Sequence, residues 1–193
     1  MTRGRTRVRS YKAFKSRIQN KGDYMNTTTR QTMFSAKSDL WGTPQDFFGK
    51  LDSLYGFTLD PCCTTDSKKC DKHYTQADDG LSKSWKDETV FVNPPYSDIV
   101  SWADKSRREA FENNAKVVML IPSRTDTKYW HNHIMKASEI FFVKGRLKFV
   151  DPTVSTSNSA PFPSAVVVFE RGMASRASGP RISTMEKDGL GKK

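Results

Sequence analysis

Strand and helix patterns alternate through the middle of the chain. Residues 90–92 and 117–121 are unbroken apolar runs, which are typical of strands covered on both faces of a parallel sheet. Between the two runs, apolar residues recur at helical spacing and predict one buried helix face, made of Ile99, Trp102, Ala103, Ala110 and Phe111. Ser97 or Asp98 is placed to cap this helix. The pattern therefore predicts a strand, a helix and a second strand, in that order.

The same alternation extends to both sides of this unit. Thr43 is a predicted helix cap and Pro44 falls in the first turn, ahead of an apolar face formed by Phe47, Phe48, Leu51 and Leu54. A short buried strand is predicted to end at Asp60. Downstream, the pattern predicts a helix and two further strands, over residues 127–137, 140–143 and 165–169. Strands that alternate with helices predict an α/β fold with a doubly wound sheet.

The two ends of the chain differ from its middle in charge. The net charge of +11 is concentrated in residues 1–30, which carry +8, and in residues 173–193, which carry +3. The isoelectric point therefore says little about the affinity of the central part for phosphate groups. We expect a disordered basic segment over residues 1–30, one folded domain over residues 31–172 and a flexible tail over residues 173–193.

Targeting signals and the start of the chain lead to two further expectations. No apolar run approaches the ~20 residues that a membrane-spanning helix requires, and the basic N-terminus lacks the apolar part of a secretory signal. We therefore expect a cytoplasmic protein without a membrane partner, and no obligate protein partner is evident. Residues 1–24 are expected to lie outside the functional protein, because Lys21-Gly22-Asp23 can be encoded by a purine-rich run that resembles a ribosome-binding site before Met25. The alternative is a basic arm that adds phosphate contacts.

The tetrapeptide Asn93-Pro94-Pro95-Tyr96 directly follows the first apolar run and carries the clearest chemistry. Proline lacks an amide hydrogen and keeps the preceding residue extended, so the carbonyl groups of Asn93 and Pro94 are not used up in a helix. The Asn93 side-chain oxygen and the Pro94 carbonyl could accept both hydrogens of one exocyclic amine and turn its lone pair outward. The Tyr96 ring could stack on a planar base. The alternative is a Pro-Pro loop after an edge strand.

This tetrapeptide resembles the catalytic motif of the amino-methyltransferases, which transfer a methyl group from S-adenosylmethionine to adenine N6, cytosine N4 or a glutamine amide. Further segments occur in order around it, at residues 39–44, 57–62, 79–85, 120–127, 145–149 and 160–169. Together they resemble the small phage-type DNA N6-adenine methyltransferases over about residues 37–172. The resemblance implies a Rossmann-like class I S-adenosylmethionine-dependent methyltransferase domain, with S-adenosylmethionine as donor and adenine in double-stranded DNA as acceptor.

The donor site is expected beyond the carboxyl end of the first strand, where Asp60 is placed. The chain has no glycine-rich phosphate loop, but S-adenosylmethionine has no pyrophosphate that would need one. By resemblance, two cofactor motifs are matched, the N-terminal one by Trp41, Thr43 and Pro44 and the first one by Asp60 and Pro61. Asp79 is a candidate for an adenine or ribose contact. The alternatives are core packing for Trp41, a plain helix cap for Thr43 and a turn at Asp79.

The acceptor base must leave the DNA stack before its amine can be attacked in line, so a flipped-out base is expected. Four cationic residues flank the predicted cleft and could hold phosphates or read base edges, namely Arg124, Lys128, Arg146 and Lys148. For each of them, a solvated surface charge is the alternative. The loop from Pro152 to Pro163 could close over the substrate, or it could be a linker without ligand contacts.

Three other interpretations remain open from the sequence. Methylation of cytosine N4 or of a protein glutamine would use the same motif chemistry, although the glutamine enzymes usually carry a glycine-rich first motif that this chain lacks. A catalytically silent DNA-binding module would keep the basic ends without binding the donor. A tetrahedral zinc site could be formed by Cys62, Cys63, Cys70 and His73, but their spacing departs from paired-cysteine knuckles. Free thiols and no metal are therefore expected.

Overall fold

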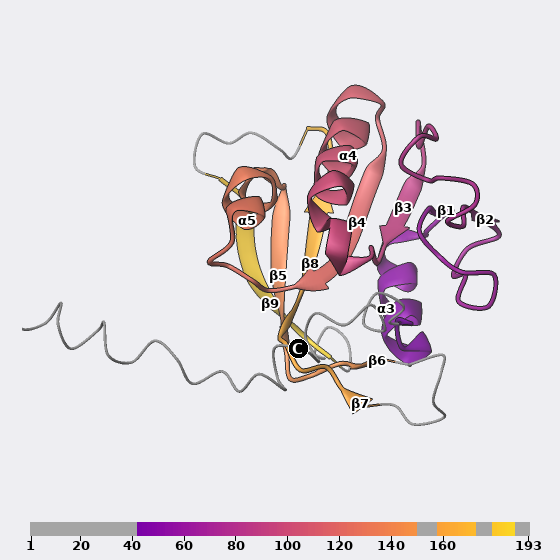
Figure 1. The fold of residues 1–193 in the computed structure, drawn as a ribbon. Helices are drawn as coiled ribbons and strands as arrows, with labels where there is room; N and C mark the ends of the chain where they lie inside the picture. The colour runs from indigo at the N-terminus through magenta and orange to yellow at the C-terminus, as the bar shows by residue number, and fades with distance from the viewer. Residues whose placement is uncertain (1–41, 150–157, 173–178, 188–193) are drawn as a thin grey trace, which may run out of the picture. The chain divides into compact units, whose positions relative to one another are not determined.

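The computed structural model describes residues 42–149, 158–172 and 179–187, all of which belong to a compact unit that begins at Ala36. Figure 1 shows the helices and strands of this unit. In chain order they are α3 (Gln45–Tyr55), β1 (Leu59–Asp60), β2 (Lys72–His73), β3 (Thr89–Val92), η2 (Tyr96–Asp98), α4 (Ile99–Glu112), β4 (Lys116–Pro122), α5 (Lys128–Asn132), η3 (Ile134–Lys136), β5 (Glu139–Lys144), β6 (Lys148–Phe149), β7 (Asn158–Ser159), β8 (Ser164–Phe169) and β9 (Arg181–Glu186).

Seven of these strands form one mixed sheet in the order β2-β1-β3-β4-β8-β5-β9. Strands β2, β1, β3 and β4 run parallel to one another, whereas β8 is antiparallel to both of its neighbours, β4 and β5. Strand β9 is the last strand in this order and is parallel to β5. Because β4 and β5 both oppose β8, the carboxyl ends of β1, β3, β4 and β5 meet at one edge of the sheet. This edge is where ligands bind in open α/β sheets.

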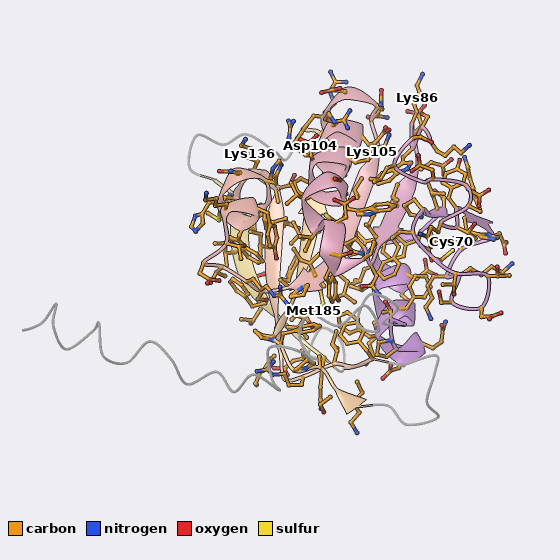
Figure 2. All side chains as sticks on the ribbon, viewed as in Figure 1. Cys70, Lys86, Asp104, Lys105, Lys136 and Met185 are labelled. Carbon is orange, nitrogen blue, oxygen red and sulfur yellow. The ribbon has the colours of Figure 1, made fainter. Side chains whose placement is uncertain are left out.

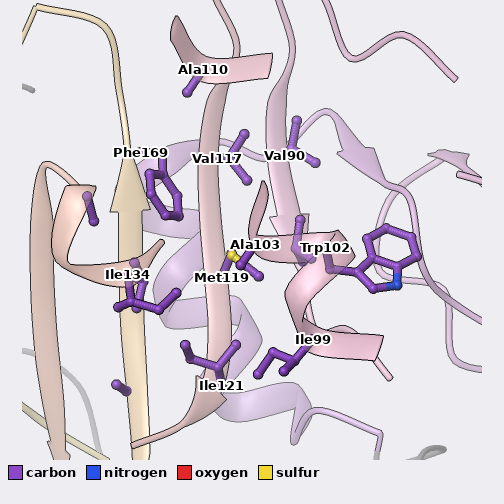
Figure 3. Close-up of a cluster of buried hydrophobic side chains, with 14 of the residues drawn as sticks. Val90, Ile99, Trp102, Ala103, Ala110, Val117, Met119, Ile121, Ile134 and Phe169 are labelled. Carbon is purple, nitrogen blue, oxygen red and sulfur yellow. The ribbon is translucent and has the colours of Figure 1, made fainter. Parts of the chain in front are cut away.

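Helices cover both faces of the sheet, because side chains of the central strands alternate between two buried clusters. On one face, α4 and α5 contribute Trp102 and Trp130 to a cluster that also contains Val117 and Met119. Figure 3 shows part of this cluster, with Ala103 and Ile99 of α4 beside Met119 and Ile121 of β4, while the Trp102 ring extends away from β4. On the other face, α3 packs in a second buried cluster with Val118 and the other strand side chains that point to that face. Both predicted apolar runs are therefore strands buried on both faces, as expected from their composition.

Three parts of the chain differ from the predicted elements. The helix predicted over residues 127–137 is divided into α5 and η3, because the backbone leaves helical geometry at His133, where φ is −120° and ψ is −51°. Leu54, predicted on the buried face of its helix, is 50% exposed. Strand β4 is parallel to β3 but antiparallel to β8, so the centre of the sheet is mixed rather than purely parallel.

The C-terminal part also differs, because residues 181–186 of the predicted flexible tail form β9. This strand pairs with β5 over six residues, and two cross-strand ion pairs accompany the pairing. Arg181 Nη1 lies 2.9 Å from Glu139 Oε1, and Lys144 Nζ lies 2.9 Å from Glu186 Oε1. Residues 181–186 form a short, mostly polar segment with a charged residue at each end. They show no alternation of apolar and polar positions, so the sequence did not indicate this strand.

Other predictions fall on parts of the chain that the structure does not describe. They concern the basic segment over residues 1–30, Trp41, and residues 152–157 of the loop that begins at Pro152. Within the described ranges, no helix combines the length and the apolar character that crossing a membrane requires.

Candidate active site

A cavity of about 600 Å³ opens at the carboxyl edge of the sheet, next to the ends of β1 and β3. Its wall is formed by residues from four segments that are far apart in the sequence. Among the predicted site residues, those that line it are Thr43, Asp60, Pro61, Asp79 and Asn93, together with Pro95. The parallel arrangement of β1 and β3 explains why these segments meet, since both strands deliver their following loops to the same edge.

Asp60 ends β1 and is almost fully buried in the cavity wall. Its carboxylate accepts hydrogen bonds from two backbone amides, that of Lys69 at 3.0 Å and that of Cys62 at 3.4 Å. Burial raises the pKa of Asp60 to about 6, although both amides and the nearby His73 and Lys69 favour the ionised form. The carboxylate therefore holds the loop after β1 and remains an anionic acceptor at neutral pH in the cavity wall.

The segment around Asp79 is held against this loop by a close backbone approach. Gly80 is buried, and a Cβ atom placed on it would lie 2.0 Å from the carbonyl oxygen of Pro61. Only glycine fits at this position without a shift of the wall. Asp79 has a positive φ of 53° and accepts a hydrogen bond from the Ser82 amide, so the predicted turn is present and also borders the cavity. Sequence reasoning selected Asp79, but Gly80 makes the critical contact.

Thr43 and Pro44 occupy different positions at the start of α3 from those predicted. Pro44 rather than Thr43 is the N-cap residue of α3, and its carbonyl accepts the Phe48 amide at 2.9 Å. Thr43 is 4% exposed, and its hydroxyl oxygen has no hydrogen-bond partner among the described residues. Thr43 thus contributes a buried hydroxyl without a described partner to the cavity wall, whereas Pro44 is not among the residues that line the cavity. A helix cap is therefore the wrong interpretation of Thr43.

The Asn93-Pro94-Pro95-Tyr96 segment leaves β3 in an extended form, as predicted from its prolines. Pro95 has φ of −58° and ψ of 124° and precedes the short helix η2. Asn93 lines the cavity, whereas Pro94 is buried. The Tyr96 hydroxyl donates a long hydrogen bond of 3.4 Å to Asn93 Oδ1. Asn93 therefore lies at the cavity wall, and its side-chain oxygen accepts this long hydrogen bond from Tyr96.

The Tyr96 ring packs outside the cavity lining, in an edge-to-face contact with Phe162 at 5.4 Å between ring centroids. Phe162 lies in the loop before β8, and its neighbour Pro163 accepts a hydrogen bond from the Ser123 amide at 2.9 Å. Sequence reasoning missed Phe162. The sequence feature that could have identified it is its position between two prolines, just before an apolar strand. It also lies within residues 160–169, one of the segments on which the family resemblance rests.

Two further cavity residues were also missed, because each resembled an ordinary structural residue. Trp102 was assigned to the helix core, and it packs there, but it also lines the cavity. Lys69 lines the cavity as well, and its ammonium group donates to Gln45 Oε1 at 2.8 Å. Partial burial lowers the pKa of Lys69, and the negative charge of Asp60 opposes that shift. The cavity lining therefore combines one lysine, Lys69, with three aspartates, Asp60, Asp79 and Asp98.

The four predicted DNA-contacting residues lie away from the cavity lining, beyond the ends of β4 and β5. Arg124 is half-buried in a turn whose carbonyl group accepts the amide and the hydroxyl of Thr127. Lys128 begins α5 and is exposed, and Arg146 and Lys148 are exposed around the start of β6. They share the carboxyl edge with Asn93 but not its cavity.

The three cysteines are free thiols. Burial raises the pKa of the Cys63 and Cys70 thiols to about 12, and it raises that of Cys62 well above the ordinary value. The thiols therefore stay protonated near neutral pH, and protonated thiols are weak nucleophiles. Across the described ranges, no three His, Cys, Asp or Glu side chains form a group able to hold a metal ion.

The relatives found by comparison with known proteins agree with one another in being named as methyltransferases. A model of the DNA N-6-adenine-methyltransferase (Dam) family matches residues 30–193. The chain is 32% identical over 114 residues to a DNA N-6-adenine-methyltransferase of Escherichia phage T1, covering 58% of this chain and 48% of the relative. It is 25% identical over 146 residues to a DNA N-6-adenine-methyltransferase of Haemophilus phage HP1 (strain HP1c1), covering 74% and 84%. It is 35% identical over 65 residues to the putative methyltransferase YfdM of Escherichia coli (strain K12), covering 30% and 71%.

The residues matched by the family model include all described elements of the sheet and every segment that surrounds the cavity. The chain spans about half the length of the phage T1 relative and most of the length of the phage HP1 relative. The family expected from the order of the sequence segments is thereby confirmed, because one family model covers more than three quarters of the chain. The chain belongs to the DNA N-6-adenine-methyltransferase (Dam) family.

Proposed function

We propose that this protein transfers a methyl group from S-adenosylmethionine to the N6 amine of adenine in double-stranded DNA. The observation that carries the proposal is that Asn93, at the end of β3, shares one cavity with Asp60, at the end of β1. The activity named for the two phage relatives agrees with it. Because its acceptor is DNA, we expect the protein to act in the cytoplasm.

The fold supports a Rossmann-like class I methyltransferase domain, which we assign to residues 31–172 together with β9. Strands β1, β3 and β4 are parallel, helices cover both faces, and one antiparallel strand is inserted beside β4. The cavity lies at the carboxyl ends of the parallel strands, where open sheets of this kind bind ligands.

The donor side of the cavity, defined here as Thr43, Asp60, Lys69, Gly80 and Trp102, fits the chemistry of S-adenosylmethionine. The volume of the whole cavity lies in the range of small-molecule binding sites. Asp60 would accept from the donor's ammonium group, and the unsatisfied Thr43 hydroxyl would pair with a polar group of the same ligand. Lys69 would face the ligand's carboxylate. When bound, S-adenosylmethionine supplies an electrophilic methyl group on a positively charged sulfur.

The acceptor side is formed by Asn93, Pro94 and Tyr96. Asn93 Oδ1 and the Pro94 carbonyl would accept the two hydrogens of the adenine amine, which orients its lone pair toward the donor side. The amine lone pair would bond to the donor's methyl carbon while the carbon–sulfur bond broke and its electron pair returned to sulfur, leaving a neutral thioether. The two oxygens would stabilise the positive charge that develops on the nitrogen until the amine released a proton to solvent. The Tyr96 hydroxyl donates a long hydrogen bond of 3.4 Å to the same Asn93 oxygen.

The base would reach this position by flipping out of the duplex, at a cost of a few kcal/mol. The Tyr96 ring would provide a stacking face, and its contact with Phe162 would keep the ring upright. Arg124, Lys128, Arg146 and Lys148 would contact the phosphates or base edges on both sides of the flipped nucleotide. Their position beyond the carboxyl ends of β4 and β5, at the edge of the sheet where β3 also ends, supports this role.

Transfer of radiolabelled methyl groups to unmethylated DNA, followed by nucleoside analysis, tests the proposal directly. We expect the label in N6-methyladenine, and we expect none with S-adenosylmethionine and a purified protein substrate in place of DNA. Label in N4-methylcytosine would contradict the assigned acceptor. A protein that binds S-adenosylmethionine but transfers no label to DNA of any sequence would contradict the assigned substrate, and a protein that binds no donor would contradict the whole proposal.

A further inference from the structure

A buried ion pair on α4 lies behind the cavity and has no part in the chemistry described so far. Lys105 Nζ and Glu109 Oε1 are 2.6 Å apart, and their side chains are only 9% and 5% exposed. Figure 2 shows Lys105 on α4 beside the strands that lead to the cavity. Removing two charges from water costs about as much as their attraction returns, so such a pair stabilises a fold little more than apolar residues of the same shape would.

The second carboxylate oxygen of Glu109 connects the pair to the segment before β3. Glu109 Oε2 accepts the backbone amide of Trp85 at 3.1 Å and the side-chain amide of Asn113 at 3.1 Å. Burial alone would raise the pKa of Glu109, but the hydrogen bonds from Lys105, Trp85 and Asn113 outweigh burial and hold this pKa below its ordinary value. Glu109 is therefore a charged acceptor that fixes the backbone of Trp85.

Trp85 in turn supports two parts of the cavity wall. Its side chain is fully buried, and its indole N–H donates to the carbonyl oxygen of Gly80 at 3.0 Å. Its ring stacks on Trp102 at 6.1 Å between centroids, with an angle of 20° between the planes. Lys105 Nζ lies 5.4 Å from the centroid of the Trp85 ring. The ion pair thus holds the backbone of Trp85 at one end and its ring at the other.

The two parts of the cavity wall that Trp85 supports, at Gly80 and at Trp102, are closely packed against their neighbours. Gly80 is in backbone contact with Pro61, and both residues line the cavity beside Asp60. A displacement of the Trp85 indole would release the Gly80 carbonyl and open the contact between Gly80 and Pro61. A displacement of its ring plane would also move Trp102, which lines the cavity from α4.

We infer that Lys105 and Glu109 are positioning residues for the cavity, acting through Trp85 on the Gly80 and Trp102 parts of its wall. The assignment of S-adenosylmethionine as the ligand of this cavity rests on the proposed function. The two residues touch no substrate. They hold the wall at the width that the donor requires.

Three variants separate positioning from general stability. Glu109→Gln keeps the side-chain shape but leaves the Lys105 ammonium buried opposite a neutral amide. The double variant Lys105→Met with Glu109→Gln removes that ammonium and keeps an amide oxygen for the Trp85 backbone amide. The double variant Lys105→Met with Glu109→Leu makes the pair apolar and leaves the Trp85 amide without its acceptor.

Calorimetric affinity for S-adenosylmethionine is the first measurement, with circular dichroism as the check of folding. We expect the dissociation constant to rise about tenfold in Glu109→Gln and in the variant with leucine, and to return to within about threefold of wild type in the double variant with glutamine. A role in stability alone predicts that affinity follows the melting temperature, whatever the acceptor at residue 109. Wild-type affinity in all three variants would overturn the inference.

Hydrogen exchange of the Trp85 indole N–H, followed by NMR without ligand, is the second measurement. Because the bond to Gly80 protects this hydrogen, we expect at least about tenfold faster exchange in the variant with leucine than in the double variant with glutamine. Equal exchange in these two would overturn the inference even if the donor did not bind. Absence of donor binding by the wild type would instead overturn the proposed function.

Arg108→Met is the matched control on the same helix. Arg108 Nε lies 3.0 Å from Asp104 Oδ2, also at i,i+4 spacing, but these side chains are 50% and 36% exposed. Donor affinity and indole exchange should both equal those of the wild type. A change in this control as large as that in Glu109→Gln would show that any charge change on α4 reaches the cavity, and would overturn the specific assignment to Lys105 and Glu109.

Discussion

The donor side of the cavity and the surface beyond β4 and β5 share one edge of the sheet but are built differently. On the donor side, Asp60 and Gly80 are buried and held by backbone contacts, and Trp102 is part of the core. Beyond β4 and β5, the proposed DNA contacts at Lys128, Arg146 and Lys148 are exposed. Folding therefore organises the small-molecule side in advance, whereas long cationic side chains on the other surface can adjust to a substrate.

This difference has a physical basis in the two ligands. A small donor must be enclosed on most sides to bind, so its site requires fixed walls. A DNA backbone is recognised mostly by charge, and charge acts over several ångströms without exact placement. Substitutions on the donor side should accordingly produce large, specific effects, and those on the surface beyond β4 and β5 should produce small, salt-dependent ones.

The largest effect is expected at Asn93, where both sides meet. Asn93→Ala removes the acceptor for the target amine but no wall contact of the donor, so the methylation rate should fall by about 100-fold or more while donor affinity stays near wild type. Single-turnover transfer and calorimetry measure the two quantities. Asn132→Ala, on the exposed end of α5, is the control and should leave both unchanged. Wild-type transfer by Asn93→Ala would remove the residue from the catalytic site.

Gly80→Ala tests how rigid the wall of the donor side is. The new Cβ would lie 2.0 Å from the Pro61 carbonyl oxygen, so the two segments must separate. We expect the donor dissociation constant to rise at least about tenfold and the melting temperature to fall, as overpacking usually costs ~1–3 kcal/mol.

The matched control is Gly49→Ala in α3, where a Cβ would meet nothing within 4 Å. There, alanine should leave donor affinity unchanged and raise stability by up to about 1 kcal/mol, because alanine favours helix more than glycine does. If Gly80→Ala matched the control in donor affinity, the donor side would be as adaptable as the surface beyond β4 and β5, and the contrast would fail.

The buried carboxylate of Asp60 should make donor binding depend on pH. Its pKa is about 6, so below that pH the group is protonated and no longer attracts the donor's ammonium. We expect the dissociation constant to rise as pH falls through about 6, and we expect weaker, nearly pH-independent binding in Asp60→Asn. Calorimetry across this range measures both. Asp126→Asn, an exposed carboxylate, should keep the wild-type profile.

Stability of the donor-free protein should respond to the same group with the opposite sign. Because the pKa of Asp60 in the fold is raised above its ordinary value of 3.8, the fold prefers the protonated carboxyl. This contribution is fully present below the unfolded pKa and is lost as pH rises through about 6. A melting temperature that changed equally with pH in wild type and Asp60→Asn would show that Asp60 is not the titrating group.

The smallest effects are expected on the surface beyond β4 and β5. Combined Arg146→Ala and Lys148→Ala should weaken DNA binding several-fold at moderate salt and reduce the salt dependence by about 0.9 in slope per lost phosphate contact. Fluorescence anisotropy at several salt concentrations measures this. Lys86→Ala is the control, because Lys86 precedes β3 and lies toward the opposite edge of the sheet (Figure 2). An equal loss in the control would mean that the assigned surface is not the DNA side.

Local sequence determined the segments that carry the chemistry. The apolar runs at residues 90–92 and 117–121 became buried strands, because unbroken apolarity is stable only between two covered faces. The prolines after Asn93 kept the chain extended as far as Pro95, directly before η2, since proline restricts its own backbone and that of the residue before it. These are effects of neighbouring residues, and they can be predicted without knowledge of the rest of the fold.

Tertiary structure decided which of those residues meet and what each one contacts. The antiparallel insertion of β8 beside β4, the pairing of β9 with β5 and the close approach of Gly80 to Pro61 all join segments distant in sequence. The connection from Glu109 to Trp85 spans 24 residues and depends on the depth at which α4 packs. Buried polar groups take the partners that the fold places within reach, and a linear pattern of apolar and polar positions does not specify those partners.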